Sequence, residues 1–291
     1  MSAKKAAFIG LGNMGYPMAG HLTKANFDVA VYNRTAKKAK AWAAEYGGAS
    51  AETPARAAEG ADIVVTCVGN DDDLRAVTLG DDGVLAGAGK GSLVIDHTTA
   101  SAIVAREVAE VAAAIGVGFL DAPVSGGQEG ALNGQLTIMV GGSEQDFAQG
   151  GPAMQAYAKA VTHMGPVGSG QLTKMINQIC CSCAIQSLAE GMNFAVKSGL
   201  DPHQVVDVTS KGAAQSWQME NRGKTMVDGK FDFGFAVDWM RKDLDICLDE
   251  ARANGAQLPL TALAETFYAR IQNQGGGRLD NSALFKLLSD A

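Results

Sequence analysis

The sequence predicts an α/β protein with two parts: an N-terminal doubly wound sheet over residues 1–164, and an all-α domain over 165–291 that begins with a long interdomain helix. Three observations support this prediction. A glycine turn lies between an apolar strand and a helix near the start of the chain. Strand patterns alternate with helix patterns as far as residue 164, which is typical of a mostly parallel sheet. Beyond residue 165, only helical patterns recur.

The glycine turn has the order strand, turn, helix, strand over residues 6–34. Gly10, Gly12 and Gly15 follow an apolar run at G-x-G-x-x-G spacing, and a second apolar strand begins at Val29. In a dinucleotide site the first glycine permits the turn, the second lets the backbone approach a pyrophosphate, and the third lets the helix pack on the strand. The helix N-terminus offers N–H groups to the phosphates. A turn that binds nothing is the alternative, but the flanking elements favour a Rossmann domain.

The second strand ends without the carboxylate that usually holds the ribose hydroxyls of NAD. Asn33, Arg34 and Thr35 stand there instead, and a guanidinium suits the geometry of a phosphate. We therefore expect NADP as the cofactor, with NAD also possible; alternatively, Asn33 and Arg34 are only turn residues. The expected cofactor-binding residues of these turns and of the next strand end are Gly10, Leu11, Gly12, Asn13, Met14, Gly15, Asn33, Arg34, Thr35 and Val68.

Composition argues against several classes of function. The 291 residues are 47% hydrophobic and 19% charged, which is ordinary for a globular enzyme. The net charge of −7 argues against a nucleic-acid surface. No apolar run stands out as long enough to span a bilayer, and the N-terminus enters the first strand without a signal peptide. We therefore expect a cytoplasmic protein that binds neither nucleic acid nor membrane.

Histidines and cysteines give no reason to expect a metal. The four histidines are scattered, and no H-E-x-x-H motif occurs. The five cysteines are expected to be small buried hydrophobic residues rather than nucleophiles, because none stands in an evidently electropositive setting.

Strands and helices alternate between the glycine turn and residue 164. Thr53 and Pro54 resemble an N-cap and a first helical position, and Ser143 with Asp146 resembles a capping box. The expected strands are 62–68, 92–96, 118–122, 136–140 and 160–164, and the longer helices are 36–46, 71–79 and one that ends near residue 115.

Residues 121–136, DAPVSGGQEGALNGQL, have the turn chemistry of a loop just past a strand end. Ser125, Gly126 and Gly127 offer a hydroxyl and unobstructed backbone N–H groups, which is the composition of an anion-binding nest. An ordinary glycine-rich connection is the alternative, and spacing alone does not separate the two.

The second domain begins with a largely apolar segment, 171–198, that is too long for a strand and indicates a buried helix. Lys174, Asn177 and Gln178 stand at i, i+3 and i+4 and therefore share a face. Lysine is rarely buried unless paired, so a lysine that reaches solvent at the helix start is the alternative to a functional one. The other expected helices are 217–226, 237–254, 259–272 and 282–288.

Four motifs carry a family resemblance over almost the whole chain. They are FIGLGNMGYPM at 8–18, DAPVSGG at 121–127, GSGQLTKMINQ at 168–178 and RKDL at 241–244. In this order they resemble the β-hydroxyacid dehydrogenase family, which includes 3-hydroxyisobutyrate dehydrogenase, tartronate semialdehyde reductase and glyoxylate/succinic semialdehyde reductases. The resemblance implies an oxidoreductase that interconverts a small β-hydroxy acid and its semialdehyde or keto acid, and residues 33–35 favour NADP(H) as its cofactor. The apolar long helix suits a homodimer or homotetramer.

The resemblance implies a catalytic role for Lys174. Many relatives carry Asn four residues after the lysine, where this chain has Gln178 with Asn177 beside it, so either amide is a candidate for contact with substrate. A positioned lysine can give or take the proton that accompanies hydride transfer. Desolvation is expected to lower the pKa of Lys174 toward neutrality.

The resemblance implies two further groups of site residues. Ser125, Gly126 and Gly127 would hold the carboxylate of the substrate. Thr99 and Lys242 would border the nicotinamide and, for Thr99, also the substrate. By residue type alone, however, Lys242 and its neighbour Asp243 are an ordinary solvated charge pair.

Three alternative functions share part of this pattern. An imine reductase and a 6-phosphogluconate dehydrogenase-like decarboxylating enzyme resemble the N-terminal domain. Lys174 argues against the first, which usually lacks this lysine, and the second has a much longer chain. A non-catalytic NADP-binding interaction domain is an alternative of a different class. Retention of Lys174 and of the anion loop argues against it, because the roles needed for proton transfer are filled.

Overall fold

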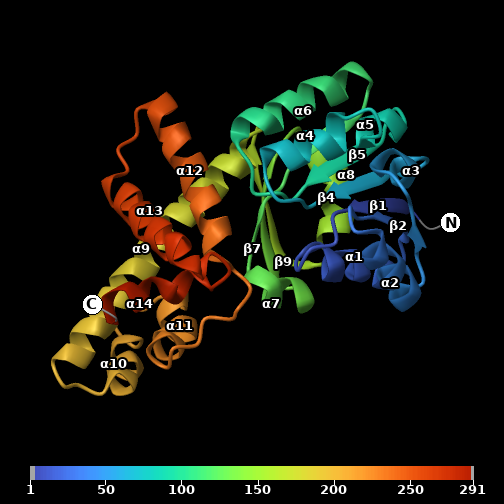
Figure 1. Ribbon diagram of the computed structural model, residues 1–291. Helices are drawn as coiled ribbons and strands as arrows, with labels where there is room; N and C mark the ends of the chain where they lie inside the picture. Colours follow the sequence, from blue (N-terminus) through green and yellow to red (C-terminus); the bar gives the residue numbers. More distant parts are fainter. Residues whose placement is uncertain (1–3, 290–291) are drawn as a thin grey trace. The chain divides into compact units, whose positions relative to one another are not determined.

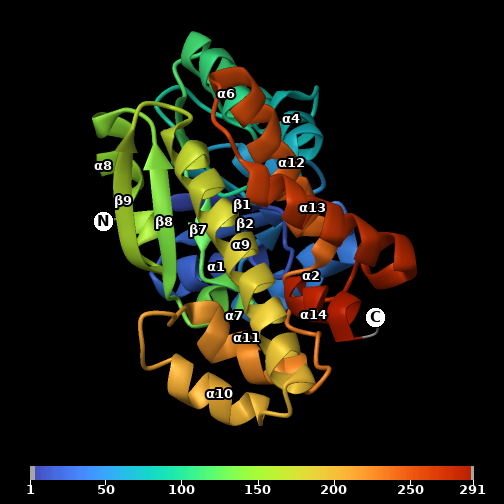
Figure 2. The ribbon, with the colours of Figure 1, turned by 90° about the vertical axis from the view of Figure 1, so that its left-hand side faces the viewer.

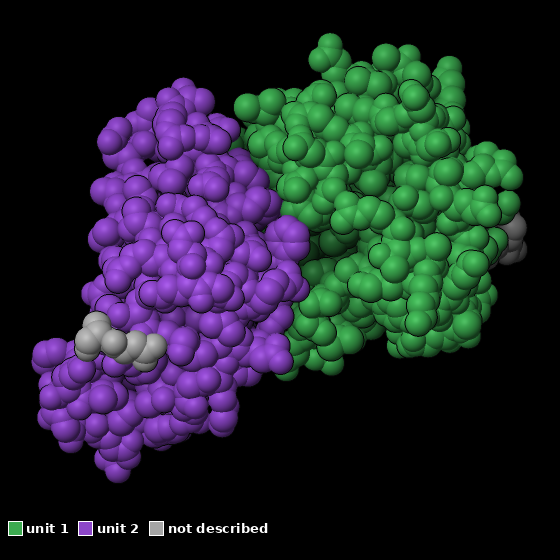
Figure 3. Space-filling view, in the orientation of Figure 1, with its two compact units in different colours: residues 1–174 green, residues 175–291 purple. Residues whose placement is uncertain are grey.

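The structure, a computed structural model, describes residues 4–289. The chain divides into two compact units, Met1–Lys174 and Met175–Ala291, which Figure 3 colours separately. The boundary falls inside the longest helix, α9 (Ser169–Lys197).

Unit 1 contains a nine-stranded sheet of order β3-β2-β1-β4-β5-β6-β8-β7, with β9 paired to β8. The strands from β1 to β6 are parallel to one another, whereas β8 runs antiparallel to both β6 and β7. Figure 2 shows β7, β8 and β9 side by side. The strands are β1 (Lys5–Ile9), β2 (Asp28–Tyr32), β3 (Ala49–Ser50), β4 (Ile63–Thr66), β5 (Leu93–Asp96), β6 (Gly118–Asp121), β7 (Val124–Ser125), β8 (Leu136–Gly141) and β9 (Ala158–Gly165).

Helices connect these strands and cover both faces of the sheet. Figure 1 shows α4 and α6 on one face and α1 and α2 on the other. The helices of unit 1 before α9 are α1 (Gly15–Lys24), α2 (Ala36–Tyr46), α3 (Pro54–Ala58), α4 (Asp71–Leu79), α5 (Val84–Gly87), α6 (Ala102–Ala114), α7 (Gly127–Leu132) and α8 (Glu144–Met154).

Successive residues of β1 enter different cores because side chains alternate across a strand. Phe8 belongs to one buried cluster with Met18 of α1 and Trp42 of α2. Ala7 belongs to the other, together with Val104 of α6. The central strands are therefore buried on both faces, which is the arrangement of a doubly wound α/β sheet.

The local signals read from the sequence account for most of these elements. The Thr53 hydroxyl accepts a hydrogen bond from the Arg56 N–H at 3.1 Å, and the Ser143 hydroxyl accepts one from the Asp146 N–H at 3.0 Å, so both predicted caps are confirmed. One expectation is wrong: residues 121–136 are not a single loop, because β7 and α7 lie within them. The short elements β3 and α5 were not expected.

The described residues of unit 2 form helices joined by loops, with no strand and one isolated bridge between Ala236 and Asp280, so the predicted all-α domain is confirmed. Its core packs Met192 of α9 with Met240 and Tyr268 from later helices. The helices after α9 are α10 (Pro202–Thr209), α11 (Trp217–Val227), α12 (Val237–Asn254), α13 (Pro259–Ile271) and α14 (Leu284–Ser289), with a π-turn at Gln272–Gly276 and a 3₁₀ turn at Asn281–Ala283.

Helix α9 departs from one expectation drawn from composition. This helix of 29 residues is long and apolar enough to cross a membrane by length and composition: an 18-residue stretch of it has a mean hydropathy of 1.2, and 39% of that stretch is buried inside the molecule. Buried helices of globular proteins satisfy the same two criteria, so they do not by themselves place α9 in a bilayer.

Candidate active site

The predicted cofactor residues follow strands whose carboxyl ends lie along one edge of the sheet. Because β2, β1, β4, β5 and β6 are parallel neighbours, the segments that follow them emerge on the same side. Ligands of open α/β sheets bind at this edge. It carries the glycine turn after β1, residues 33–35 after β2, Val68 after β4, Thr99 after β5 and Ser125 after β6.

The three glycines of the turn have the different environments that a dinucleotide site requires. Gly10 has a φ of +97°, and a methyl group there would lie 2.2 Å from the carbonyl oxygen of Cys67. A methyl group at Gly15 would lie 2.0 Å from the carbonyl oxygen of Gly10. At Gly12 it would meet no protein atom within 4 Å. No side chain caps the N-terminus of α1. The open backbone and the uncapped helix fit a bound pyrophosphate.

Gly12→Ala should therefore separate cofactor binding from folding. We expect the free energy of unfolding to change by less than about 0.5 kcal/mol, whereas the Kd for NADPH should rise roughly 10- to 100-fold because the methyl group would clash with the phosphates. Gly89→Ala is the matched control, since a methyl group there also meets nothing within 4 Å. Fluorescence titration and chemical denaturation measure the two quantities. Unchanged NADPH affinity in Gly12→Ala would contradict this placement of the pyrophosphate.

The residues after β2 divide into a structural and an exposed group. The Asn33 side chain accepts a hydrogen bond from the Leu11 N–H at 2.9 Å and donates to the carbonyl of Thr35 at 3.2 Å, so it ties this turn to the glycine turn. The Arg34 side chain is 88% exposed, and its Nη1 lies 3.4 Å from Asp73 Oδ1. Arg34 and the exposed Thr35 are therefore available to a phosphate, while the Asn33 side chain is engaged within the turn.

A buried network after β5 was missed by sequence reasoning. Asp96 Oδ1 accepts hydrogen bonds from the Thr66 hydroxyl at 2.7 Å and from the Thr98 N–H at 3.1 Å. The Thr98 hydroxyl accepts from the Val68 N–H at 3.0 Å. This network connects the ends of β4 and β5, and it positions Val68 and the half-buried Thr99 at the edge of the sheet.

Burial shifts the pKa values of two neighbours in this network in opposite directions. Desolvation raises the pKa of Asp96 from 3.8 to about 7. It lowers the pKa of His97 from 6.5 to about 4. His97 Nδ1 lies 2.5 Å from the carbonyl oxygen of Ala122, and Nε2 lies 2.8 Å from the Tyr157 hydroxyl, so the neutral ring is held on both sides.

Asp96→Asn should expose the contribution of His97 to pH-dependent stability. Asp96 contributes fully to the free energy of unfolding below pH 3.8, and this contribution is lost as pH rises through about 7. His97 contributes fully above pH 6.5, and its contribution is lost as pH falls through about 4. Where the two ranges overlap, between about pH 4 and 6.5, the two contributions change with pH in opposite directions. Removing Asp96 should therefore make the free energy of unfolding increase more steeply with pH than in the parent, by about 1.4 kcal/mol per pH unit near pH 5 to 6.

Denaturant titrations at several pH values measure this difference. The substitution is mild, because Asp96 Oδ2, where the amide nitrogen could sit, has no hydrogen-bond partner within the described residues. Parallel pH profiles for variant and parent would show that Asp96 does not hold a proton in the folded protein.

The start of α9 is fixed by residues that lie inside the recognised motifs but were not singled out. Asp121 Oδ1 accepts from the Gly168 N–H at 2.7 Å, and Oδ2 accepts from the Gln171 N–H at 2.8 Å. The Gln171 amide donates to the Thr98 carbonyl at 2.8 Å and accepts from the Ala100 N–H at 3.1 Å. Asp121 and Gln171 therefore anchor the first turn of α9 to the ends of β5 and β6.

Lys174 follows Gln171 by one helical turn and is only 7% exposed. The alternative in which this lysine extends into solvent is therefore wrong. Its place one turn after the anchored start of α9 gives this titratable group a defined backbone position in unit 1.

The Ser125 segment has the backbone of a tight turn rather than of an open loop. Ser125 lies in β7 opposite Thr137 of β8. Gly126 and Gly127 have φ values of +134° and +62°, and a methyl group at Gly127 would meet nothing within 4 Å. His21 Nε2 lies 3.0 Å from the carbonyl oxygen of Ala131, which connects α1 to α7. The segment is held from two sides and has an open backbone at Gly127.

The other predicted polar residues form a chain within unit 2. The Asn177 side chain donates to Oε1 of the Gln178 side chain at 2.8 Å, and Nε2 of Gln178 donates to Asp243 Oδ2 at 2.5 Å. Lys242 Nζ lies 2.9 Å from Asp243 Oδ1. Asp243 is 3% exposed, so the expectation of a solvated Lys242–Asp243 pair is wrong. The buried carboxylate orients Gln178 and holds Lys242.

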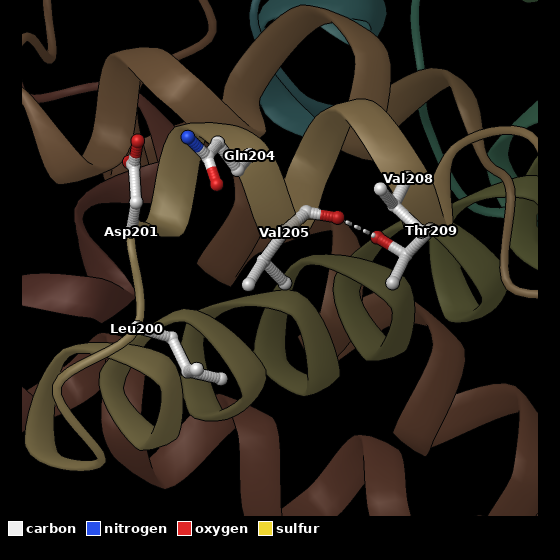
Figure 4. Close-up of a pocket in the computed structure, with 6 residues that line it drawn as sticks. All are labelled: Leu200, Asp201, Gln204, Val205, Val208 and Thr209. Atoms are coloured by element: carbon white, nitrogen blue, oxygen red, sulfur yellow. Dashed lines mark hydrogen bonds between the residues drawn. The ribbon is translucent and has the colours of Figure 1, made fainter.

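Two other features lie outside the set of predicted site residues. A cavity of about 270 Å³ lies beside α10 and is lined by Leu200, Asp201, Gln204, Val205, Val208 and Thr209 (Figure 4), none of them a predicted site residue. Cys180 and Cys183 stand at C-x-x-C spacing, which sequence reasoning missed. The expectation of buried cysteines is correct for Cys247 and wrong for the others, because Cys180 is exposed and Cys67, Cys181 and Cys183 are half-buried. Among residues 4–289, no group of three or more potential ligands could hold a metal.

Comparison with known proteins covers both units. Residues 5–165 match the family model of the NAD-binding domain of 6-phosphogluconate dehydrogenase, and residues 168–288 match that described as NAD-binding of NADP-dependent 3-hydroxyisobutyrate dehydrogenase. An uncharacterized oxidoreductase of Shewanella frigidimarina is 58% identical over 98% of each chain. The 3-hydroxyisobutyrate dehydrogenase of Pseudomonas aeruginosa is 35% identical over 97% of each chain.

A solved structure agrees with these sequence matches. The 3-hydroxyisobutyrate dehydrogenase of Mycobacterium tuberculosis, determined with L-serine, has a TM-score of 0.89 and 32% identity, and the match covers 98% of this chain and 99% of that one. With its glycine turn, its anchored α9 and its helical second unit, the chain therefore belongs to the 3-hydroxyisobutyrate dehydrogenase-like β-hydroxyacid dehydrogenase family of NAD(P)-dependent oxidoreductases.

Proposed function

We propose that the protein is an NADP(H)-preferring oxidoreductase that interconverts a small β-hydroxy acid and its semialdehyde or keto acid, with Lys174 as general acid and base. The observation that carries this proposal is the buried Lys174, one turn after an α9 start that Asp121 and Gln171 anchor to the cofactor edge of the sheet. Lysine is rarely buried in proteins, so a buried lysine at this point of the chain is a candidate for a role in chemistry.

The chain's own residues account for cofactor binding. The open backbone at Gly12 and the N-terminus of α1 would receive the pyrophosphate. Arg34 would bind a 2′-phosphate, with Thr35 beside it, and Val68, Thr99 and Lys242 would border the nicotinamide end. A bound nicotinamide supplies or accepts the hydride, and the protein provides position and charge.

Substrate binding would follow from two groups at the same edge. Ser125, Gly126 and Gly127 would bind the carboxylate through a hydroxyl and backbone N–H groups, because charge-assisted hydrogen bonds are the stronger kind. The oxygen that gains or loses a proton would then lie near the Lys174 ammonium group. Gln178 is held by the buried Asp243 carboxylate, so we assign the substrate contact at this turn of the helix to Asn177, which would exchange its hydrogen bond with the Gln178 side chain for one with the substrate.

The alternative functions receive less support. The match to 6-phosphogluconate dehydrogenase is confined to residues 5–165, whereas residues 168–288 match 3-hydroxyisobutyrate dehydrogenase. Imine reductases and non-catalytic relatives would not need a lysine buried at this position.

Initial rates with NADPH and NADH test the cofactor part of the proposal. Glyoxylate, succinic semialdehyde, tartronate semialdehyde and methylmalonate semialdehyde are suitable substrates. The parent should prefer NADPH, and Arg34→Ala should weaken NADPH far more than NADH, by about 1.5–3 kcal/mol for a lost charge-assisted contact. Equal or better use of NADH by the parent would exclude the proposed preference.

A further inference from the structure

Arg34 and Asp73 meet across the site proposed for the cofactor. Arg34 follows β2, and Asp73 lies in the first turn of α4, which follows β4. Because β1 lies between β2 and β4 in the sheet, their ion pair spans the carboxyl end of β1, where the glycine turn begins. Nη1 and Oδ1 are 3.4 Å apart, and the side chains are 88% and 35% exposed.

Asp73 is distinguished from the two carboxylates beside it. Asp71 accepts from the Ser101 N–H at 2.9 Å and from its hydroxyl at 2.5 Å. Asp72 lies 3.5 Å from Arg75 in its own helix, with a side chain that is 95% exposed. The backbone N–H of Asp73 donates to the Asn70 cap at 2.8 Å, which fixes its position at the helix start. Of the three, Asp73 is the one directed at Arg34.

We propose that Asp73 is a specificity-determining residue that competes with the 2′-phosphate for Arg34 and so limits the preference for NADP over NAD. This inference rests on the proposed role of Arg34. Asp73 contacts Nη1, so a 2′-phosphate that is bound through Nη1 and a second nitrogen of the guanidinium must take the place of this carboxylate. A carboxylate this close to Arg34 also repels the phosphate dianion. NAD has no 2′-phosphate, so its affinity should not depend on Asp73.

Direct binding of NADPH and NADH, measured by the fluorescence of the reduced nicotinamide, tests the proposal without an activity assay. Asp73→Asn should lower the Kd for NADPH about two- to fivefold, the range expected for a partly exposed ion pair, and change the Kd for NADH by less than about 1.5-fold. Asp72→Asn removes the same charge one residue away and is the matched control; it should leave both Kd values unchanged within the same limit.

The Arg34→Ala background shows whether the effect passes through Arg34. In that background only the direct repulsion of the phosphate remains, so Asp73→Asn should improve NADPH relative to NADH clearly less than it does in the parent. The proposal would be overturned if Asp73→Asn changed the Kd values for NADPH and NADH equally. It would also be overturned if Asp72→Asn had as large an effect as Asp73→Asn. Either result would leave the role of Arg34 intact. If Arg34→Ala itself leaves the NADPH to NADH ratio unchanged, the proposed phosphate contact fails first, and the role of Asp73 fails with it.

Discussion

Replacing succinic semialdehyde by butyraldehyde is expected to lower kcat/KM by about 10²- to 10⁴-fold, because two charge-assisted hydrogen bonds of about 1.5–3 kcal/mol each are lost. The two aldehydes have the same chain length and differ in the carboxylate. The turn at Ser125 is held by β8 and by α1, and its glycines have positive φ, so its backbone is fixed before a substrate binds. Pinning the substrate at one end also orients its carbonyl, so kcat should fall as well as KM rise.

Ser125→Ala provides the control on the protein side. It should reduce kcat/KM for succinic semialdehyde and leave the already poor rate with butyraldehyde nearly unchanged. Similar kcat/KM values for the two aldehydes with the parent protein would remove the carboxylate role from this segment.

Lys174→Ala is expected to lower kcat by roughly 10²- to 10⁴-fold, the usual worth of a positioned proton donor. The reason is local: the side chain is buried on a helix start that Asp121 and Gln171 fix in place, so bulk water cannot readily substitute for it. Steady-state kinetics with NADPH and an active semialdehyde measure the effect.

Two further substitutions separate proton transfer from charge and from folding. Lys174→Arg keeps a positive charge but cannot release a proton near neutral pH, so it should be nearly as slow as Lys174→Ala. The exposed Lys159 of β9 is a matched lysine away from the site, and Lys159→Ala should retain the parental kcat. The Kd for NADPH should be retained in both Lys174 variants. A Lys174→Arg variant with parental kcat would show that charge, not proton transfer, is what the position supplies.

Turn glycines and helix N-caps in the sequence were sufficient to predict most of the fold. The G-x-G-x-x-G turn located β1 and α1, and Thr53 and Ser143 located the starts of α3 and α8. The same signal was present in Asp201 and Pro202, an N-cap and a first helical position, but α10 was not predicted from it. The family resemblance, which was drawn from four short motifs, is confirmed by matches over both units.

The site was less accessible to sequence reasoning because its supporting residues act through tertiary contacts. Asp121 and Gln171 lie 50 positions apart, and nothing in their spacing shows that one caps the helix that carries the other. Residue type predicts a solvated Lys242–Asp243 pair, because residue type does not reveal burial. The contact that buries Asp243 with Gln178 spans 65 positions of the sequence. The role of the glycines, by contrast, was predictable from the sequence. What requires glycine at these positions is local: the backbone φ angle and the lack of space for a side chain.

Transfer of deuterium tests the central claim most directly. NADPH deuterated on the transferring face of nicotinamide C4, incubated with the protein and each of the four semialdehyde or keto-acid substrates, should yield a hydroxy acid with one deuterium on the carbon that bears the new hydroxyl, detected by mass spectrometry and NMR. The account predicts this product for at least one carboxylate-bearing substrate with the parent protein and its near absence with Lys174→Ala over the same time. Oxidation of NADPH without deuterium on that carbon, or equal product formation by Lys174→Ala, would contradict it.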